Sequence, residues 1–179
     1  MSGDDASGVS AAVEHLVDLG HRDILHLAGP PNLSTSSKRA VAFTAACARH
    51  SEVRGKIIEA ESLTTWAGES AMKAALEAGE TPTAVVAGND LIALGALRAL
   101  RVHGLRCPDD VSVVGFNDMP FAEDFNPPLT TVHVPTEAMG KRAAQLILEA
   151  IDSNVIDQQT VTLPVSLVVR SSTAPPPSR

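Results

Sequence analysis

Aromatic residues and positive charge are both scarce in this sequence of 179 residues. It has no Tyr and one Trp, and aromatics make up 3% of it, which is thin for a protein that binds nucleic acid by stacking bases on rings. Acidic residues outnumber basic ones by 21 to 14, so the net charge is -7. Because phosphate binding needs clustered Lys and Arg, this chain is a poor candidate for holding DNA by itself.

Disulfide frameworks, membrane spans and signal segments are missing as well. The two cysteines, Cys47 and Cys107, have no framework spacing, and we expect both to be reduced, apolar fillers. The longest apolar runs are far below the roughly 18 residues of a membrane span. The chain opens on the small and polar "MSGDDASG", so we expect a cytoplasmic protein with no membrane partner.

Catalytic and metal-binding patterns are also lacking. We find no G-x-S-x-G elbow, no phosphate-cradling G-x-x-x-x-G-K-[ST], and no G-x-G-x-x-G after the first predicted strand. His103 and Cys107 flank a helix stop and do not make a zinc site, and the carboxylate pair Glu59 and Glu61 is weak evidence for acid-base chemistry. We therefore expect no enzyme activity, no catalytic residue, no metal and no cofactor.

What the sequence does contain is an alternation of short apolar segments with longer segments of helical periodicity. After a helix at 8–20, strands are predicted at 23–29, 56–60, 83–88 and 110–116, with helices at 34–50, 64–79 and 90–104 between them. This order predicts an α/β fold with a parallel sheet flanked by helices. A long loop with three prolines follows at 117–131, then a strand at 131–134, a helix at 136–152 and two strand-like pieces separated by Pro164.

Polar residues follow the apolar runs at the carboxyl ends of the predicted strands, where open α/β sheets bind their ligands. Asn89 comes after the third strand, Asn117 and Asp118 after the fourth, and Arg39 lies shortly after the first. Such donors and acceptors suit a polar small molecule. Two alternatives stay open: Asn89 and Asp90 also suit a helix N-cap, and Asn117 and Asp118 suit a turn.

Trp66 allows two interpretations. It could serve as a stacking platform for a sugar ring, or it could be a helix residue that packs with Met72.

Several segments, in register, resemble the effector-binding core of the LacI/GalR family of bacterial transcription regulators. "DDASGVSAAVEHLVDLGHRDILHLAGP" is similar to the family's D-N-x-x-G…H-L-x-x-L-G-H-R-x-I…G-P, and "SSKRAVAF" to its R-x-x-G-F element. "TPTAVVAGNDLIALGALRALRVHGLRCPDDVSVVGFNDMP" follows P-T-A…N-D-x-x-A-x-G…V-P-x-D-V-S-V-V-G-F-D-D, and "NPPLTTVHVP" follows P-P-L-T-T-V-x-x-P. The resemblance covers residues 4 to 175.

The resemblance implies a periplasmic-binding-protein-like type I fold of two lobes with an effector clamped between them. Residues 21–133 and 160–173 would form the C-terminal lobe, 4–20 a remnant helix of the N-terminal lobe, 134–159 a crossover helix of that lobe, and 174–179 a disordered tail. The first half of the N-terminal lobe and the DNA-reading helix-turn-helix would lie outside this sequence, so DNA would be bound only through that absent domain. The apolar faces of the helices at 8–20 and 136–152 would then lack a partner sheet, which favours a homodimer or larger assembly.

Residue by residue, the resemblance places effector contact on Arg39, Asn89 and Asn117, with Asp4 and Leu63 as weaker positions at the cleft. Asp118 would brace the loop. Leu94, Arg98 and Phe125 would face a partner subunit, although Leu94 could simply pack in the core.

Two positions depart from the family pattern. Asn117 stands where the family usually has Asp, and Leu63 where it often has an aromatic residue, which makes a typical sugar effector less certain. The resemblance still predicts the small-molecule sensor of a repressor, whose effector is a sugar or related polar metabolite. The alternative is a periplasmic-type solute-binding protein of a transporter, which shares the fold.

Overall fold

The computed structural model describes residues 2–153 and 160–177, and its main feature is one six-stranded sheet. The strands lie in the order β3-β2-β4-β5-β6-β8, all parallel except β8, which is antiparallel to β6. Their bounds are β2 (Asp23–Ala28), β3 (Arg54–Glu59), β4 (Ala84–Ala87), β5 (Ser112–Asn117), β6 (Thr130–His133) and β8 (Ser166–Val168). The predicted α/β class and its strands are confirmed.

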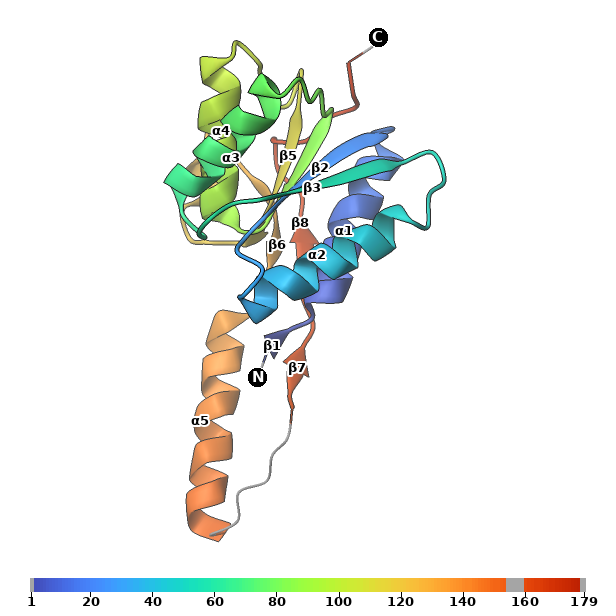
Figure 1. Cartoon of the computed structure of the whole chain (residues 1–179). Helices are drawn as coiled ribbons and strands as arrows, with labels where there is room; N and C mark the ends of the chain where they lie inside the picture. The colour runs from blue at the N-terminus through green and yellow to red at the C-terminus, as the bar shows by residue number, and fades with distance from the viewer. Residues whose placement is uncertain (1, 154–159, 178–179) are drawn as a thin grey trace.

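Two pairs of helices cover the two faces of this sheet (Figure 1). One face carries α1 (Asp5–Asp18) and α2 (Ser34–Cys47), and the other carries α3 (Thr65–Glu77) and α4 (Asp90–Val102). Each face has its own apolar cluster, so the central strands β2, β4 and β5 are buried on both sides. This explains why their sequences are continuously apolar rather than alternating.

The helices α3 and α4 pack unusually close to each other. A Cβ atom on Gly95 would lie 2.1 Å from the carbonyl oxygen of Thr65, and one on Gly68 would lie 2.5 Å from the carbonyl oxygen of Ile92. Glycine at these two positions therefore allows the backbones of the two helices to come into contact.

The expectation that the helix at 8–20 lacks a partner surface is wrong. Val9, Val13 and Leu16 are 1%, 0% and 0% exposed, because α1 packs on α2 and on the sheet. The close approach depends on Gly8, where a Cβ atom would lie 2.9 Å from Val132. The lobe boundaries drawn at residues 20, 133 and 160 stay a prediction, but α1 is part of the same packed unit as the six-stranded sheet.

The remaining elements extend away from this unit. The helix α5 (Thr136–Ser153) projects beside a two-stranded sheet of β1 (Ser2–Gly3) and β7 (Thr162–Leu163) (Figure 1). Ile147, Leu148 and Ile151 of α5 are 61%, 61% and 68% exposed, as expected for a helix whose apolar face has no sheet to cover. In the described ranges, no helix is both long and apolar enough to span a bilayer.

The predicted tail at 174–179 begins too early. The Ala174 amide donates to Ser112 Oγ at 3.0 Å, and the Ala174 carbonyl oxygen lies 2.8 Å from His21 Nε2. Since Ser172 is also fully buried, the chain stays packed against the sheet as far as residue Ala174. Residues 178–179 lie outside the described residues.

Candidate functional site

The carboxyl ends of β2, β4 and β5 lie side by side in the sheet, and the predicted contact residues gather at this edge. Parallel register brings the loops after these strands together. We call this edge the rim, and define it by Arg39, Leu63, Asn89 and Asn117 together with Asp4 and Asp5 at the start of α1.

Arg39 connects three segments of the rim. Its Nε donates to Asp5 Oδ1 at 2.7 Å, its Nη1 donates to the carbonyl oxygen of Gly88 at 2.6 Å, and its Cζ lies 3.6 Å from the ring centroid of Phe116. Burial lowers the pKa of Arg39, while the hydrogen bond to Asp5 opposes that change. These bonds use two of the five guanidinium N–H donors, so the side chain is held in place and still has donors to offer.

Asn89 has a structural role at the rim. Its Oδ1 accepts from the Ile92 amide at 2.8 Å, so it is the N-cap of α4, and its Nδ2 donates to the carbonyl oxygen of Leu63 at 3.1 Å. The capping alternative is therefore confirmed for Asn89, which also fixes the position of Leu63. One N–H of its amide group is left for another partner.

Leu63 lies over the end of β2. A Cβ atom on Gly29 would come within 2.4 Å of Leu63 Cδ2 and 2.5 Å of Ser36 Oγ. The buried Ser36 Oγ has no hydrogen-bond partner among the described residues. Glycine is needed at position 29 because both side chains approach its backbone.

The segment Gly115–Met119 turns sharply at the end of β5. Asn117 has φ 116° and Asp118 has φ 56°, in the left-handed region that residues other than glycine rarely adopt. Asp118 is 2.9 Å from His133 Nδ1 and accepts from Arg170 Nη2 at 2.8 Å, so it attaches the turn to β6 and to the segment after β8. Within the described residues, the Asn117 side chain has no hydrogen-bond partner, and it is partly exposed.

Asp4 is occupied by its own helix. Its carboxylate accepts from the Ser7 amide at 3.0 Å and from Ser7 Oγ at 2.6 Å, which makes it the N-cap of α1. The Ser7 hydroxyl lowers the pKa of Asp4. Beside it lies a hollow of about 510 Å³ between the start of α1 and the outer face of α2, which includes Asp5 and Lys38.

Asp90 lies buried next to the rim residue Asn89, and the sequence assigned it no role beyond capping. It is 0% exposed, and its carboxylate reaches across the carboxyl edge to β6 and to the turn after β5. Burial raises its pKa, and the hydrogen bond from Thr131 acts in the opposite direction. The dipeptide "ND" after an apolar strand is also an ordinary start of a helix. No local signal in the sequence therefore predicts that the Asp90 side chain reaches β6 and the turn after β5.

The residues predicted to face a partner subunit lie on the α4 side of the sheet. Leu94 is half-buried against the core, Arg98 is exposed, and Phe125 is buried and stacked on Phe121 with ring centroids 5.8 Å apart. Trp66, at the start of α3, is 61% exposed. Most of its surface therefore lies outside the core in which Met72 is buried, and both interpretations of Trp66 stay predictions.

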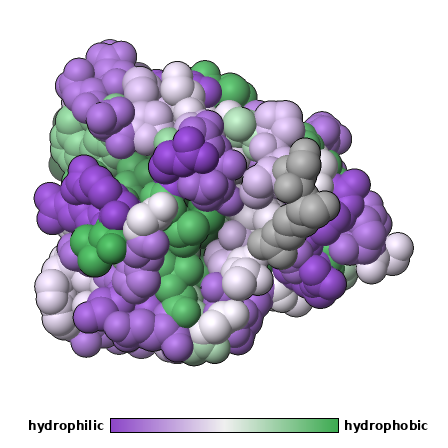
Figure 2. Space-filling view, turned by 90° about the horizontal axis from the view of Figure 1, so that it is seen from above, coloured by the Kyte–Doolittle hydropathy of each residue, from purple (hydrophilic) through white to green (hydrophobic). Residues whose placement is uncertain are grey.

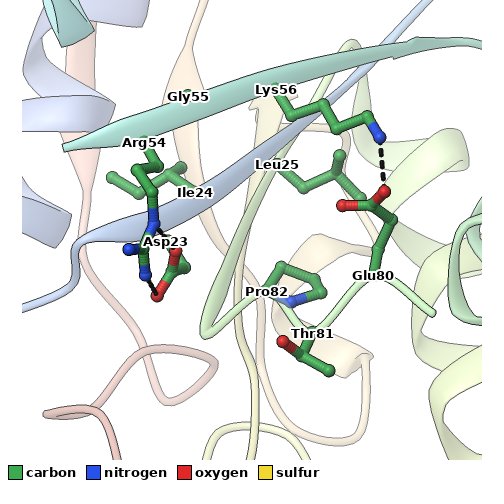
Figure 3. Close-up of a pocket in the computed structure, with 9 residues that line it drawn as sticks. All are labelled: Asp23, Ile24, Leu25, Arg54, Gly55, Lys56, Glu80, Thr81 and Pro82. Carbon is green, nitrogen blue, oxygen red and sulfur yellow. Dashed lines mark hydrogen bonds and ion pairs between the residues drawn. The ribbon is translucent and has the colours of Figure 1, made fainter.

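The opposite end of the molecule offers different chemistry. Figure 2 looks onto the end away from α5 and shows hydrophobic residues in a central hollow between hydrophilic ones. A pocket of about 210 Å³ lies at the amino ends of β2 and β3, where Arg54 pairs with Asp23 and Lys56 pairs with Glu80 (Figure 3). The charged side chains of this pocket pair with one another, so we place the candidate ligand site at the rim.

Metal chemistry has no support in the described part of the chain. No group of three or more His, Cys, Asp or Glu residues there could hold a metal ion. Burial also raises the pKa of Cys47 to about 11 and that of Cys107 to about 12, which disfavours the metal-binding thiolate form near neutral pH.

Comparisons with known proteins agree with this arrangement. A family model described as a periplasmic binding protein-like domain matches residues 13–173. The transcriptional regulator MalR of Streptomyces coelicolor is 40% identical over 99% of this chain and 52% of its own length, so the chain spans about half the length of the curated relatives it matches.

Solved structures show the same similarity. A dimeric lac repressor with a C-terminal deletion has a TM-score of 0.90 and 32% identity over 97% of this chain and 64% of its own. A LacI family transcriptional regulator from Enterococcus faecalis, solved with bound ribose, has a TM-score of 0.86 and 31% identity over 97% and 62% of the two chains.

Proposed function

This chain belongs to the LacI family of transcriptional regulators, and from that premise we propose that it is the effector-binding and dimerisation part of a repressor. The observation that carries the proposal is the geometry of Arg39, which is anchored by Asp5, Gly88 and Phe116. Phe116 directly precedes Asn117, whose side-chain amide has no hydrogen-bond partner among the described residues. Such a rim is prearranged to bind a ligand, and prearrangement lowers the entropy cost of binding.

The chemistry of the rim favours a neutral effector rich in hydroxyl groups. Asp4, Asp5 and Asp118 are each engaged by hydrogen bonds from the protein. What remains for a ligand is the Asn117 amide, a spare Asn89 N–H and the remaining Arg39 donors. These groups suit a sugar or related polar metabolite. The relative solved with ribose supports that class.

In this proposal Arg39, Asn89 and Asn117 contact the effector directly, and Leu63 provides an apolar wall. Asp4 contributes at the edge of the cleft, beside the hollow at the start of α1. Asp118 acts as a brace through His133 and Arg170. Effector binding would change the arrangement of the two lobes and so alter DNA binding by a separate helix-turn-helix domain.

We further propose a homodimer formed through Leu94, Arg98 and Phe125, in a cytoplasmic protein without enzyme activity. The similarity to a dimeric lac repressor supports the dimer. The exposed Trp66 follows Thr65, whose carbonyl oxygen packs on Gly95 beside Leu94. The relatives are transcriptional regulators, which favours a sensor over an enzyme and gives no support to the alternative of a transporter component.

The test is a thermal-melt series against sugars, sugar phosphates, nucleosides and purines, starting with D-ribose. A specific ligand at about 100 times its dissociation constant adds about 2.7 kcal/mol of stability, and a dose-dependent rise in Tm is the expected result. Asn117→Gly should remove the rise, and glycine tolerates the φ of 116° at this position without strain. Asp110→Asn, at the other edge of the sheet, should leave the rise unchanged. A panel without any effect, or turnover of a compound, would contradict the proposal.

A further inference from the structure

We infer that Asp90 is a positioning residue for the effector site, because its buried carboxylate holds the turn Gly115–Met119 in the conformation that presents Asn117. The inference rests on the proposed function, in which Asn117 contacts the effector. Asp90 would touch no ligand itself, since its side chain is fully buried beneath the rim.

The carboxylate of Asp90 connects three elements. Its Oδ1 accepts from Thr131 Oγ1 of β6 at 2.5 Å, and its Oδ2 accepts from the Met119 amide at 2.8 Å. Asp90 is the first residue of α4, directly after the Asn89 cap, so the same two residues fix Leu63 on one side and the turn on the other.

Gly115 makes room for this arrangement. A Cβ atom at that position would lie 2.3 Å from Asp90 Oδ1 and 2.7 Å from Leu129. The sequence "GFND" therefore has a physical explanation. Glycine admits the carboxylate, Phe116 stacks on Arg39, and the next two residues form the turn.

The turn needs such a support because two successive residues, Asn117 and Asp118, have φ values of 116° and 56°. Backbone in these sparsely populated regions persists only where surrounding contacts impose it. Asp118 has its own partners in His133 and Arg170, and the carbonyl oxygen of Asn117 accepts from the Val134 amide only at 3.4 Å. The bond from Met119 to Asp90 closes the other end of the turn.

A neutral amide would hold the turn more weakly than this carboxylate, because it makes no charge-assisted hydrogen bonds and keeps only one acceptor. Asp90 uses both oxygens as acceptors toward N–H and O–H donors, whereas Asn has one acceptor and one donor group. No ion pair to Asp90 occurs in residues 2–153 and 160–177. The buried carboxylate of Asp90 is therefore stabilised by its hydrogen bonds to the turn and to β6. The same hydrogen bonds hold the turn in place beside the proposed site.

The experiment compares Asp90→Asn with the wild type and with the control Asp110→Asn. Asp110 also accepts a hydrogen bond from a backbone amide, that of Arg106 at 2.8 Å, but lies before β5 at the other edge of the sheet.

NMR measures the three-bond HN–Hα couplings of Asn117 and Asp118, which report φ, and the hydrogen exchange of the Met119 amide. In Asp90→Asn we expect the Asn117 coupling to move toward the value of extended backbone, and Met119 exchange to accelerate about tenfold, the factor for one hydrogen bond to a charged group. Asp110→Asn should change neither.

The second arm is a double-mutant cycle with D-ribose as the probe. Asp90→Asn should weaken binding about tenfold, and adding it to Asn117→Gly should cost no further affinity, because Asp90 acts through Asn117. Additive losses, or an unchanged Asn117 coupling in Asp90→Asn, would overturn the inference. If Asp90→Asn does not fold cooperatively, Thr131→Val removes one partner of the carboxylate and is measured in the same way. A wild type that binds no ribose counts against ribose as effector, while the NMR arm still decides the role of Asp90.

Discussion

Arg39 and Asp5 form an ion pair that is buried between the start of α1 and the first half of α2, with 2.7 Å between Arg39 Nε and Asp5 Oδ1. The side chains are 10% and 7% exposed. The pair joins residues 34 positions apart in sequence and holds the guanidinium against Phe116 at the rim. It is therefore a structural element of the fold and of the proposed site at once.

Asp5→Asn should destabilise the protein strongly, because it leaves the buried Arg39 charge without its carboxylate. Loss of one partner of a buried pair costs about 3–5 kcal/mol, and urea unfolding monitored by circular dichroism would measure it. The matched control is Lys73→Ala, which breaks the exposed pair with Glu77 and should change stability little. Equal effects of the two substitutions would contradict the structural role assigned to the Arg39 pair.

Acidification should destabilise the fold through His26. Burial lowers the pKa of His26 from 6.5 to about 4, against the opposing hydrogen bond to the Val86 carbonyl. Below pH 6.5 His26 is protonated in the unfolded chain, whereas in the folded chain it stays neutral down to about pH 4. The free energy of unfolding therefore decreases as the pH falls from 6.5 to 4, by roughly 3 kcal/mol in total. Burial lowers the pKa values of His15 and His21 as well, which acts in the same direction.

His26→Asn keeps a donor for Val86 and removes the titration, so the slope of stability against pH between 6.5 and 4 should become shallower. His103→Asn is the control, because His103 Nδ1 also lies 2.8 Å from a carbonyl oxygen, that of Ala99, but its side chain is on the surface. Denaturant unfolding at several pH values measures both. The idea fails if the two variants show the same slope.

Gly95→Ala should destabilise the packing of α3 on α4. The added methyl group would lie 2.1 Å from the Thr65 carbonyl oxygen and 2.4 Å from the Glu69 amide nitrogen, and such overpacking costs typically 1–3 kcal/mol. Gly140→Ala in α5 meets no atom within 4 Å and should be neutral or slightly stabilising, as expected for alanine in a helix. A lower Tm for Gly95→Ala alone is the expected outcome of a melting comparison.

The dimer proposed through Leu94, Arg98 and Phe125 predicts a change in the environment of Trp66, the one tryptophan of the chain. Its side chain is 61% exposed, so burial in an interface should shift its fluorescence to shorter wavelength as protein concentration rises. Leu94→Asp should abolish both the shift and the dimer seen by light scattering. Light scattering that shows a monomer throughout the micromolar concentration range would contradict the proposed dimer.

Sequence reasoning predicted the order of the strands and helices because its signals are local. A continuous apolar run such as "AVVA" indicates a strand buried on both faces, and a helical repeat such as "DLIALGALRAL" indicates a helix buried on one face. Each of these segments forms the expected element. The same local signals left Asn89 open between capping and ligand contact. Its distances to Ile92 and Leu63 show the cap and leave one amide N–H, so ligand contact by Asn89 stays a prediction.

Tertiary structure alone decided which distant segments meet. The apolar face of α1 could have belonged to any sheet, and only Gly8 against Val132 and Phe116 shows that it packs on this one. Asp90 reads as a helix start in sequence, yet its partner Thr131 is 41 residues away. Amino-acid patterns thus determined the elements and the edge at which polar residues gather, because these depend on neighbours along the chain. The buried partners of Arg39 and Asp90 depend on how the layers pack, which periodicity does not encode.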